Sequence, residues 1–173
     1  MLISDAYLAL NQQMHQKYPG WGHSPDEWVA TTILRYLKTQ DVLDYGAGKC
    51  AMRDVLKDCP VYVQCYDPCI AEIAARPRIA ETVLCNKTLE HVEPECIDAV
   101  LDDIRLLAKK YVILKVTTIA SGVNLPDGRN AHLIVEPANW WLEKLLPRWG
   151  LLYAETMKQG FRFIGETHGF GQS

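Results

Sequence analysis

Two aspartates and the glycine turn between them are the residues of this chain whose types and spacing best fit a chemical role. Asp44 ends a short apolar run before the turn Gly46-Ala47-Gly48, and Asp67 ends the next apolar run about 20 residues further on. Glycine lets the backbone turn sharply and lie against a ligand. A carboxylate at Asp67 suits the two hydroxyls of a ribose, while one at Asp44 attracts an ammonium or sulfonium group. The pattern predicts a site for a positively charged nucleoside cofactor.

The same turn also fits a dinucleotide-binding pattern, with Gly46, Gly48 and Ala51 at the G-x-G-x-x-G/A positions. That interpretation predicts a nicotinamide-dependent oxidoreductase. The carboxylate of Asp44 counts against it, because a negative charge beside a pyrophosphate is repulsive. The sequence therefore favours a cationic cofactor over a dinucleotide.

Alternating apolar strands and amphipathic helices must position these residues. The hydrophobic pattern predicts strands over 41–45, 61–66, 82–86 and 111–117. It predicts helices over 3–17, 24–38, 49–57 and 95–109 and from Pro137 onward, with Ser24 as the N-cap of the second. Two last strands, 151–155 and 161–164, form a predicted hairpin. This order indicates an α/β, Rossmann-like, doubly wound fold whose mostly parallel sheet ends in a C-terminal antiparallel hairpin.

Composition narrows the class of protein. The chain has 173 residues, 49% hydrophobic and 23% charged, with a net charge of -3, which predicts a single domain over 1–173. Without a polybasic run or a long apolar run, neither capture of long nucleic acid nor a membrane span is expected. Six cysteines without a signal peptide predict a cytoplasmic protein with reduced thiols. Cys65 and Cys69 lack a second pair at zinc-site spacing, so no metal site is predicted.

Segment 42–50, with its acid ahead of the glycines, resembles motif I of the class I S-adenosylmethionine-dependent methyltransferases. Segments 84–92 and 125–133, the pair Trp140-Trp141 and segment 18–24 resemble a subgroup of small bacterial and phage methyltransferases. The resemblance implies S-adenosylmethionine as the cofactor. It also implies methyl transfer to a small molecule or to a modest group on a macromolecule.

The resemblance implies cofactor contacts at the strand ends. The acid of motif I, Asp44, would hold the methionine end, and Asp67 the ribose. Backbone groups near Leu84 and Cys85 are expected at the adenine, because the acid that usually follows the third strand has no counterpart. Asn86 stands where many relatives carry an aspartate that faces cofactor or substrate. The expected cofactor-binding residues are Asp44, Gly46, Ala47, Gly48, Asp67, Pro68, Cys85 and Asn86.

Two departures from the family pattern bear on activity. Cys50 stands where a third glycine is usual, and about fifteen residues between Asp67 and Thr82 leave no room for the usual helix, strand and crossover. The third strand is therefore predicted to be missing or vestigial. These departures leave open a second interpretation, a catalytically weak or inactive module that binds S-adenosylmethionine or a partner.

The acceptor side of the site is expected to involve histidines and aromatic residues. His91 and His132 are candidate catalytic bases or substrate anchors; the alternative is that they cap or pack. Residues 1–40 are expected to form a helical lid over a core of 41–173. The expected substrate-binding residues are Tyr18, Trp21, Arg129, Asn130 and Trp141. The alternative is hydrophobic packing for the aromatic residues and loop solvation for Arg129 and Asn130.

Overall fold

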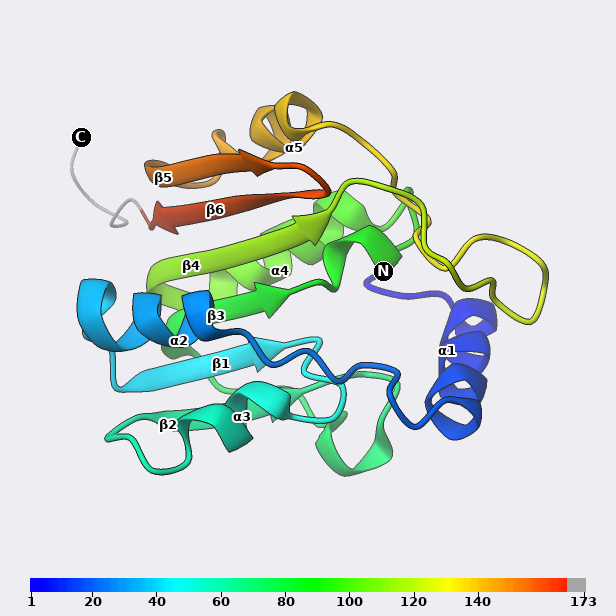
Figure 1. Ribbon diagram of the computed structural model, residues 1–173, viewed down its shortest axis with the longest axis horizontal. Coiled ribbons are helices and arrows are strands. Elements are labelled where there is room, and N and C mark those ends of the chain that lie inside the picture. Colours follow the sequence, from blue (N-terminus) through cyan, green and yellow to red (C-terminus); the bar gives the residue numbers. More distant parts are fainter. Residues whose placement is uncertain (168–173) are drawn as a thin grey trace.

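The computed structural model describes residues 1–167, which form a six-stranded sheet in the order β2-β1-β3-β4-β6-β5 (Figure 1). β2, β1, β3 and β4 are parallel neighbours, while β6 pairs antiparallel with both β4 and β5. The predicted α/β fold with its C-terminal hairpin is confirmed. The strands are β1 (Asp41–Tyr45), β2 (Tyr62–Tyr66), β3 (Ala80–Asn86), β4 (Ala108–Thr117), β5 (Gly150–Met157) and β6 (Gly160–Glu166).

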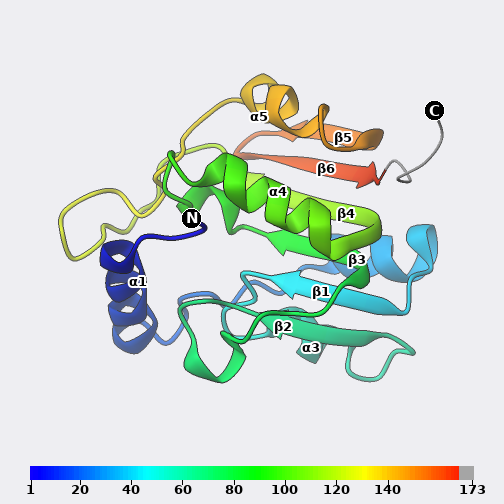
Figure 2. The same ribbon diagram turned by 180° about the vertical axis from the view of Figure 1, so that it is seen from behind.

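Helices cover both faces of the sheet. α2, η1 and α3 lie on the face seen in Figure 1, and α4 and α5 lie on the face seen in Figure 2. This is the doubly wound arrangement expected of a mostly parallel sheet. The helices are α1 (Asp5–Lys17), α2 (Glu27–Thr31), the π-helix η1 (Thr32–Leu37), α3 (Ala51–Leu56), the short η2 (Ala71–Ile73) and η3 (Leu89–His91), α4 (Ile97–Leu107) and α5 (Ala138–Leu145).

The period of two along the strands builds a core on each face. On β1, Val42 packs in the cluster that includes Val29 of α2 and Met52 of α3, whereas Leu43 and Tyr45 pack in the cluster of α4 and α5. Asp44 shares the face of Val42, so the alternation that buries the strand also directs this carboxylate toward α3. Its placement follows from strand geometry rather than from any partner.

The chain between β2 and β3 is short. Residues 67–79 contain only turns and η2, so β2 lies at the edge of the sheet with no strand beyond it. This confirms that the third strand of the family pattern is missing.

The helix predicted over 24–38 differs from the expectation at both ends. Its N-cap is Asp26, whose Oδ1 accepts a hydrogen bond from the Val29 N–H at 3.2 Å, and not Ser24. A turn of α-helix then passes into π-helix and ends at Lys38 in the left-handed conformation. Val29 and Ile33 are fully buried against the sheet. Within the expected lid of 1–40, residues 27–37 therefore belong to the core layer.

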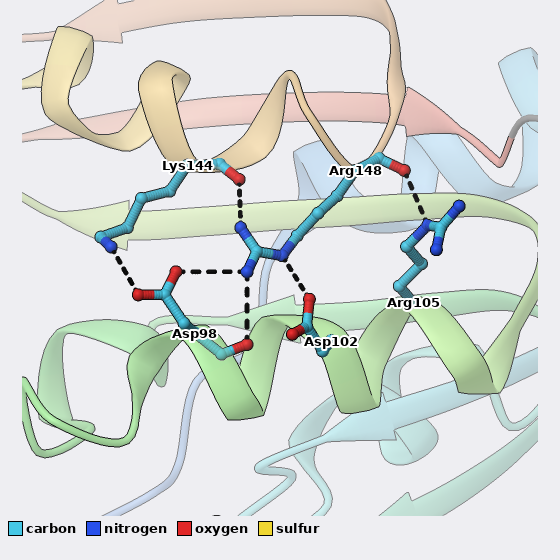
Figure 3. A network of polar contacts seen from close by, with 5 residues as sticks. All are labelled: Asp98, Asp102, Arg105, Lys144 and Arg148. Atoms are coloured by element: carbon cyan, nitrogen blue, oxygen red, sulfur yellow. Dashed lines mark hydrogen bonds and ion pairs between the residues drawn. The ribbon is translucent and has the colours of Figure 1, made fainter.

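Polar contacts tie α5 to α4 (Figure 3). Arg148 donates to the carboxylates of Asp98 at 3.2 Å and Asp102 at 2.7 Å, and Lys144 pairs with Asp98 at 2.9 Å. Arg148 also donates to the Lys144 carbonyl at 2.7 Å, and Arg105 donates to the Arg148 carbonyl at 3.2 Å. The guanidinium thus links two carboxylates and a helix C-terminus, which orients α5 against the sheet.

α1 stands apart from both helical layers, beyond the carboxyl ends of β1, β3 and β4 (Figure 1). Its backbone is held there by Ser4, whose N–H and hydroxyl donate to the Glu93 carboxylate at 2.8 and 2.6 Å. Among residues 1–167, no helix has both the length and the apolar character that crossing a membrane requires.

Candidate active site

A cavity of about 330 Å³ lies at the carboxyl ends of the parallel strands. Its walls come from the ends of β1, β2 and β4, from segment 87–93 after β3, and from α1 with segment 21–24. Open α/β sheets bind their ligands at this edge, because the loops that leave the strands diverge there. The volume is at the small end of the range for small-molecule sites, about 300–1,000 Å³.

The glycine turn after β1 is packed tightly by the chain itself. Gly46 and Gly48 have positive φ angles of 75° and 50°. A Cβ on Gly46 would lie 2.2 Å from the Thr88 side chain, and one on Gly48 would lie 2.3 Å from the Gly22 carbonyl oxygen. That carbonyl accepts a hydrogen bond from the Lys49 N–H at 2.9 Å. Glycine is therefore required at both positions even before a ligand is considered.

The cysteine in place of the third glycine keeps the glycine's conformation. Cys50 has a φ of 58°, in the left-handed region, and begins α3. A non-glycine residue there costs roughly 1–2 kcal/mol. The turn thus retains the backbone path of motif I without its third glycine. All six cysteines are free.

Asp44 borders a second, smaller cavity of about 30 Å³, together with Gly46, Ala47 and Asn86. The carboxyl is 4% exposed and receives no hydrogen bond from residues 1–167. Burial, and then the charge of Asp67, raises its pKa to about 7. The Asn86 Oδ1 atom is also buried without a partner, while its Nδ2 donates to the Ser24 carbonyl at 2.9 Å. The small cavity therefore presents acceptors that lack a donor.

Asp67 borders the larger cavity, at the neighbouring strand end. Its Oδ2 accepts from the Gly48 N–H at 3.1 Å and its Oδ1 from the Cys69 N–H at 2.9 Å. A carboxylate can accept about four hydrogen bonds, so these two leave acceptor capacity toward the cavity. The two acids that the sequence pointed out do lie at one edge of the sheet, on either side of the glycine turn.

Residues 22–24 run between the two cavities. Gly22 and Ser24 contribute to the walls of both, and Gly22 rests on Gly48. This segment belongs to the expected lid of 1–40, and its role as a lid stays a prediction.

α1 supplies cavity residues that the sequence interpretation missed. Tyr7, Asn11 and His15 line the larger cavity at successive four-residue intervals along one helix face. The Tyr7 hydroxyl donates to the His91 carbonyl, and burial raises the pKa of this phenol to about 12. The spacing of these three residues, at i, i+4 and i+8, was the sequence signal that could have placed them on one face of the helix.

His91 and His132 meet at the wall of the larger cavity. Their ring centroids lie 4.9 Å apart, and Trp21 contacts His91 edge-on at 5.2 Å. Burial lowers the pKa of His91, which favours the neutral imidazole. Trp21, Pro68 and both histidines border this cavity. The sequence predicted that all four lie near the cofactor or the acceptor.

Three predicted site residues are placed in the core or under the turn. Trp141 is fully buried in the core cluster between α5 and the sheet, so the expectation that it rims the pocket is wrong. The side chain of Cys85 is fully buried on the same face of β3. Gly48 is covered by Gly22. Neither Cys85 nor Gly48 borders either cavity, because strand alternation and close backbone packing enclose them.

Three others serve the loops around the site. Tyr18 ends α1 and packs beside the cluster of Tyr7 and Met14. Arg129 pairs with Asp127 at 2.8 Å. Asn130 spans the 121–130 loop, accepting from the Ser121 N–H at 2.9 Å and donating to its carbonyl at 2.8 Å. None of Tyr18, Arg129 and Asn130 borders either cavity, and their contacts with a substrate stay a prediction.

No protein-family model matches this chain, and no curated protein sequence does. Solved structures do resemble it. The 1,6-didemethyltoxoflavin-N1-methyltransferase of Burkholderia thailandensis, with bound 1,6-didemethyltoxoflavin and S-adenosylhomocysteine, has a TM-score of 0.66 at 15% identity over 95% of this chain and 90% of that one. The PH0226 protein of Pyrococcus horikoshii has a TM-score of 0.66 at 11% identity over 90% and 99%.

A third structure, DhpI in complex with S-adenosylhomocysteine, has a TM-score of 0.58 at 17% identity over 96% of this chain and 95% of that one. At such identities the likeness concerns the fold. Sheet order, glycine turn and coverage agree with the resemblance found in the sequence, and the chain therefore has the Rossmann-like fold of the class I methyltransferases.

Proposed function

We propose that this chain binds S-adenosylmethionine at the carboxyl edge of its sheet and transfers the methyl group to a small molecule. The observation that carries the proposal is the small cavity beside the glycine turn, which is lined by acceptors without donors. The S-adenosylhomocysteine bound in two structures of the same fold supports it.

The small cavity suits an ammonium group. The Asp44 carboxylate and the Asn86 Oδ1 atom need hydrogen-bond donors, and Asp44 also needs a positive charge when ionised. A cavity of about 30 Å³ has the size of such a group rather than of a ring. The α-ammonium of a methionine moiety supplies both donors and charge, whereas the pyrophosphate of a dinucleotide would add negative charge.

The larger cavity suits the remainder of the cofactor and the acceptor. Asp67 has the acceptor capacity that ribose hydroxyls require, with Pro68 beside it. S-adenosylmethionine supplies a methyl group on a cationic sulfur. Trp21, His91 and His132 then orient the acceptor and exclude water, and a neutral imidazole takes up the proton that a hydroxyl or amine acceptor loses.

We expect residues 22–24 to move away from the turn when the whole cofactor binds, because Gly22 and Ser24 line both cavities and Gly22 rests on Gly48. The contact is a backbone one: the Gly22 carbonyl accepts from the Lys49 N–H. Opening it breaks this hydrogen bond and the one that Asn86 Nδ2 donates to the Ser24 carbonyl, a net change of about 1–3 kcal/mol. Cofactor contacts offset that cost.

Calorimetric titration of the full chain with S-adenosylhomocysteine tests the proposal. We expect saturable binding, weakened roughly 10- to 100-fold in Asp67→Asn, because hydrogen bonds to a charged acceptor contribute about 1.5–3 kcal/mol. The matched control is Asp58→Asn, an exposed aspartate remote from both cavities, which should bind as the parent does. Absence of binding at millimolar ligand, or equal dissociation constants for the parent and Asp67→Asn, would refute the proposal.

A second candidate function is binding of the cofactor without transfer. It is favoured by the contact of Gly22 with Gly48 and by the use of both Asp67 oxygens within the chain. Incubation with methyl-labelled S-adenosylmethionine and a panel of small hydroxyl, amine and thiol acceptors separates the two. Label in an acceptor supports the enzyme, and tight binding with no labelled acceptor supports the binding module.

A further inference from the structure

Three side chains with metal-ligand chemistry converge on the wall of the larger cavity. Glu90 and His91 belong to η3, and His132 comes from the loop after β4, more than forty positions later in the sequence. One ligand-type atom from each lies within 4.8 Å of those of the other two. The cavity reaches all three residues.

Both imidazoles are held in the same tautomer. His91 Nδ1 lies 2.8 Å from the Ala131 carbonyl oxygen, and His132 Nδ1 lies 2.6 Å from that of Ile119. A carbonyl oxygen only accepts, so each Nδ1 carries the proton and each Nε2 keeps a free lone pair. Histidines that bind metals are oriented in this way, with the other ring nitrogen donating to a backbone carbonyl.

Glu90 lacks a partner for half of its carboxylate. The residue is 0% exposed. Its Oε1 accepts from the Thr117 N–H at 2.9 Å, but its Oε2 is buried with no hydrogen-bond partner. No lysine or arginine of residues 1–167 forms an ion pair with it. Since a buried carboxylate needs a compensating cation, the histidine lone pairs and this oxygen together describe a cation site.

We propose that Glu90, His91 and His132 bind a divalent first-row transition metal ion of the zinc or cobalt type. Two imidazole nitrogens and one carboxylate oxygen favour these ions over magnesium and calcium, which prefer oxygen ligands throughout. Ligands sharing such an ion lie about 3.4 Å apart, so loading draws the three groups slightly together. All three residues border the cavity, so an ion held between them would be reached from it.

The metal site rests on its own geometry and not on the proposed methyl transfer. Where transfer does occur, which rests on the proposed function, the ion would bind an oxygen of the acceptor and lower the pKa of its hydroxyl. The proton would then leave to water, because imidazoles that ligate the ion no longer act as bases; the imidazole base described above belongs to the metal-free site. The sequence predicted no metal site, since Cys65 and Cys69 lack a second pair at zinc-site spacing. Only the fold brings the distant loop residue to the Glu90-His91 pair.

Titration of the metal-free full chain with Co²⁺, followed by visible absorption, tests the site. We expect one ion per chain and ligand-field bands without thiolate charge-transfer absorption, since the site holds no cysteine. Affinity should fall roughly tenfold or more in Glu90→Gln and in His132→Ala. His132 is a half-buried loop residue, so its variant keeps the test open should Glu90→Gln fail to fold. His23→Ala is the matched control, because His23 borders the same cavity outside the cluster.

Absence of Co²⁺ binding, unchanged affinity in both variants, or thiolate absorption would overturn the metal site; the last result would assign the ion to free cysteines. Titration of the same samples with S-adenosylhomocysteine is read separately. Cofactor binding without metal binding rejects this site and leaves the proposed function intact. Metal binding without cofactor binding supports this site and rejects the proposed function.

Discussion

Replacing Asp44 with asparagine removes the buried charge on which the proposed cofactor site depends. The carboxyl is buried at the small cavity, lacks a donor and lies near Asp67. Burial is the larger cause and the Asp67 charge the smaller one for a pKa raised from 3.8 to about 7. The neighbouring thiols of Cys65 and Cys85 have pKa values raised by burial, so they stay neutral from pH 5 to 8. Of Asp44, Cys65 and Cys85, only Asp44 therefore changes its charge between pH 5 and 8.

The sign of the effect on stability follows from these pKa values. In the unfolded chain Asp44 ionises near pH 3.8, while in the folded protein it keeps its proton until about pH 7. Between these values the folded state binds more protons, so stability falls as pH rises, by about 1.4 kcal/mol per pH unit. The total reaches up to about 4 kcal/mol above pH 7. Asp44→Asn should therefore stabilise the free protein at pH 7.5 and leave it nearly unchanged at pH 4.

Cofactor binding should show the opposite dependence. An ammonium beside Asp44 requires the ionised carboxylate, so binding below pH 7 releases a proton. We expect the affinity for S-adenosylhomocysteine to rise roughly tenfold per pH unit from 5.5 to 6.5 and to level off above 7. In Asp44→Asn the affinity should be weaker at pH 7.5 and flat over this range.

Two measurements check this reasoning. Urea denaturation of the parent and of Asp44→Asn at pH 4 and 7.5 gives the stability difference at each pH. Calorimetry in buffers of different ionisation enthalpy counts the protons released on binding. A parent protein that binds S-adenosylhomocysteine equally well at pH 5.5 and 7.5, without proton release, would show that Asp44 does not face the cofactor's cation.

The remaining predictions concern the stability of the scaffold. Lys38 is exposed with a φ of 51°, so Lys38→Gly should stabilise the protein by up to about 1 kcal/mol, measured by thermal and urea unfolding. The control Lys57→Gly, at an exposed helix end with a φ of -56°, should destabilise it, and equal effects of the two changes would contradict the argument from backbone strain. Arg148→Ala should cost about 1–2 kcal/mol in the same assay, because its half-buried guanidinium links α4 carboxylates to a backbone carbonyl. Lys144→Ala should cost less than about 0.5 kcal/mol, since its partner Asp98 is 59% exposed; a cost equal to that of Arg148→Ala would argue against the network.

Much of the fold could be predicted from local patterns. Apolar runs located all six strands to within about three residues at each end, and the short segment after Asp67 indicated the missing third strand. β4 begins at Ala108 rather than 111, because the chain leaves α4 directly into the sheet and pairs with Ala80. Helix ends were less predictable: Asp26 displaced Ser24 as the N-cap, and the π-helix η1 left no recognised signal in the composition.

Only part of the candidate site could be predicted from local patterns. Asp44, Asp67 and the glycine turn were predictable because parallel strands deliver the residues that follow them to one edge of the sheet. The Trp141 side chain lies in the core and those of Arg129 and Asn130 bond within their own loop, because sequence position near a site does not say where a side chain points.

The amino-acid sequence by itself determined the parallel core, the turn after β1 and the two acids beside it, because strand periodicity and glycine chemistry act over a few neighbouring residues. The tertiary structure decided the rest. It laid Gly22 on Gly48, set Tyr7 of α1 over the cavity and brought His132 to Glu90 and His91. Those contacts join distant segments, and packing of whole elements, rather than any local pattern, selects them.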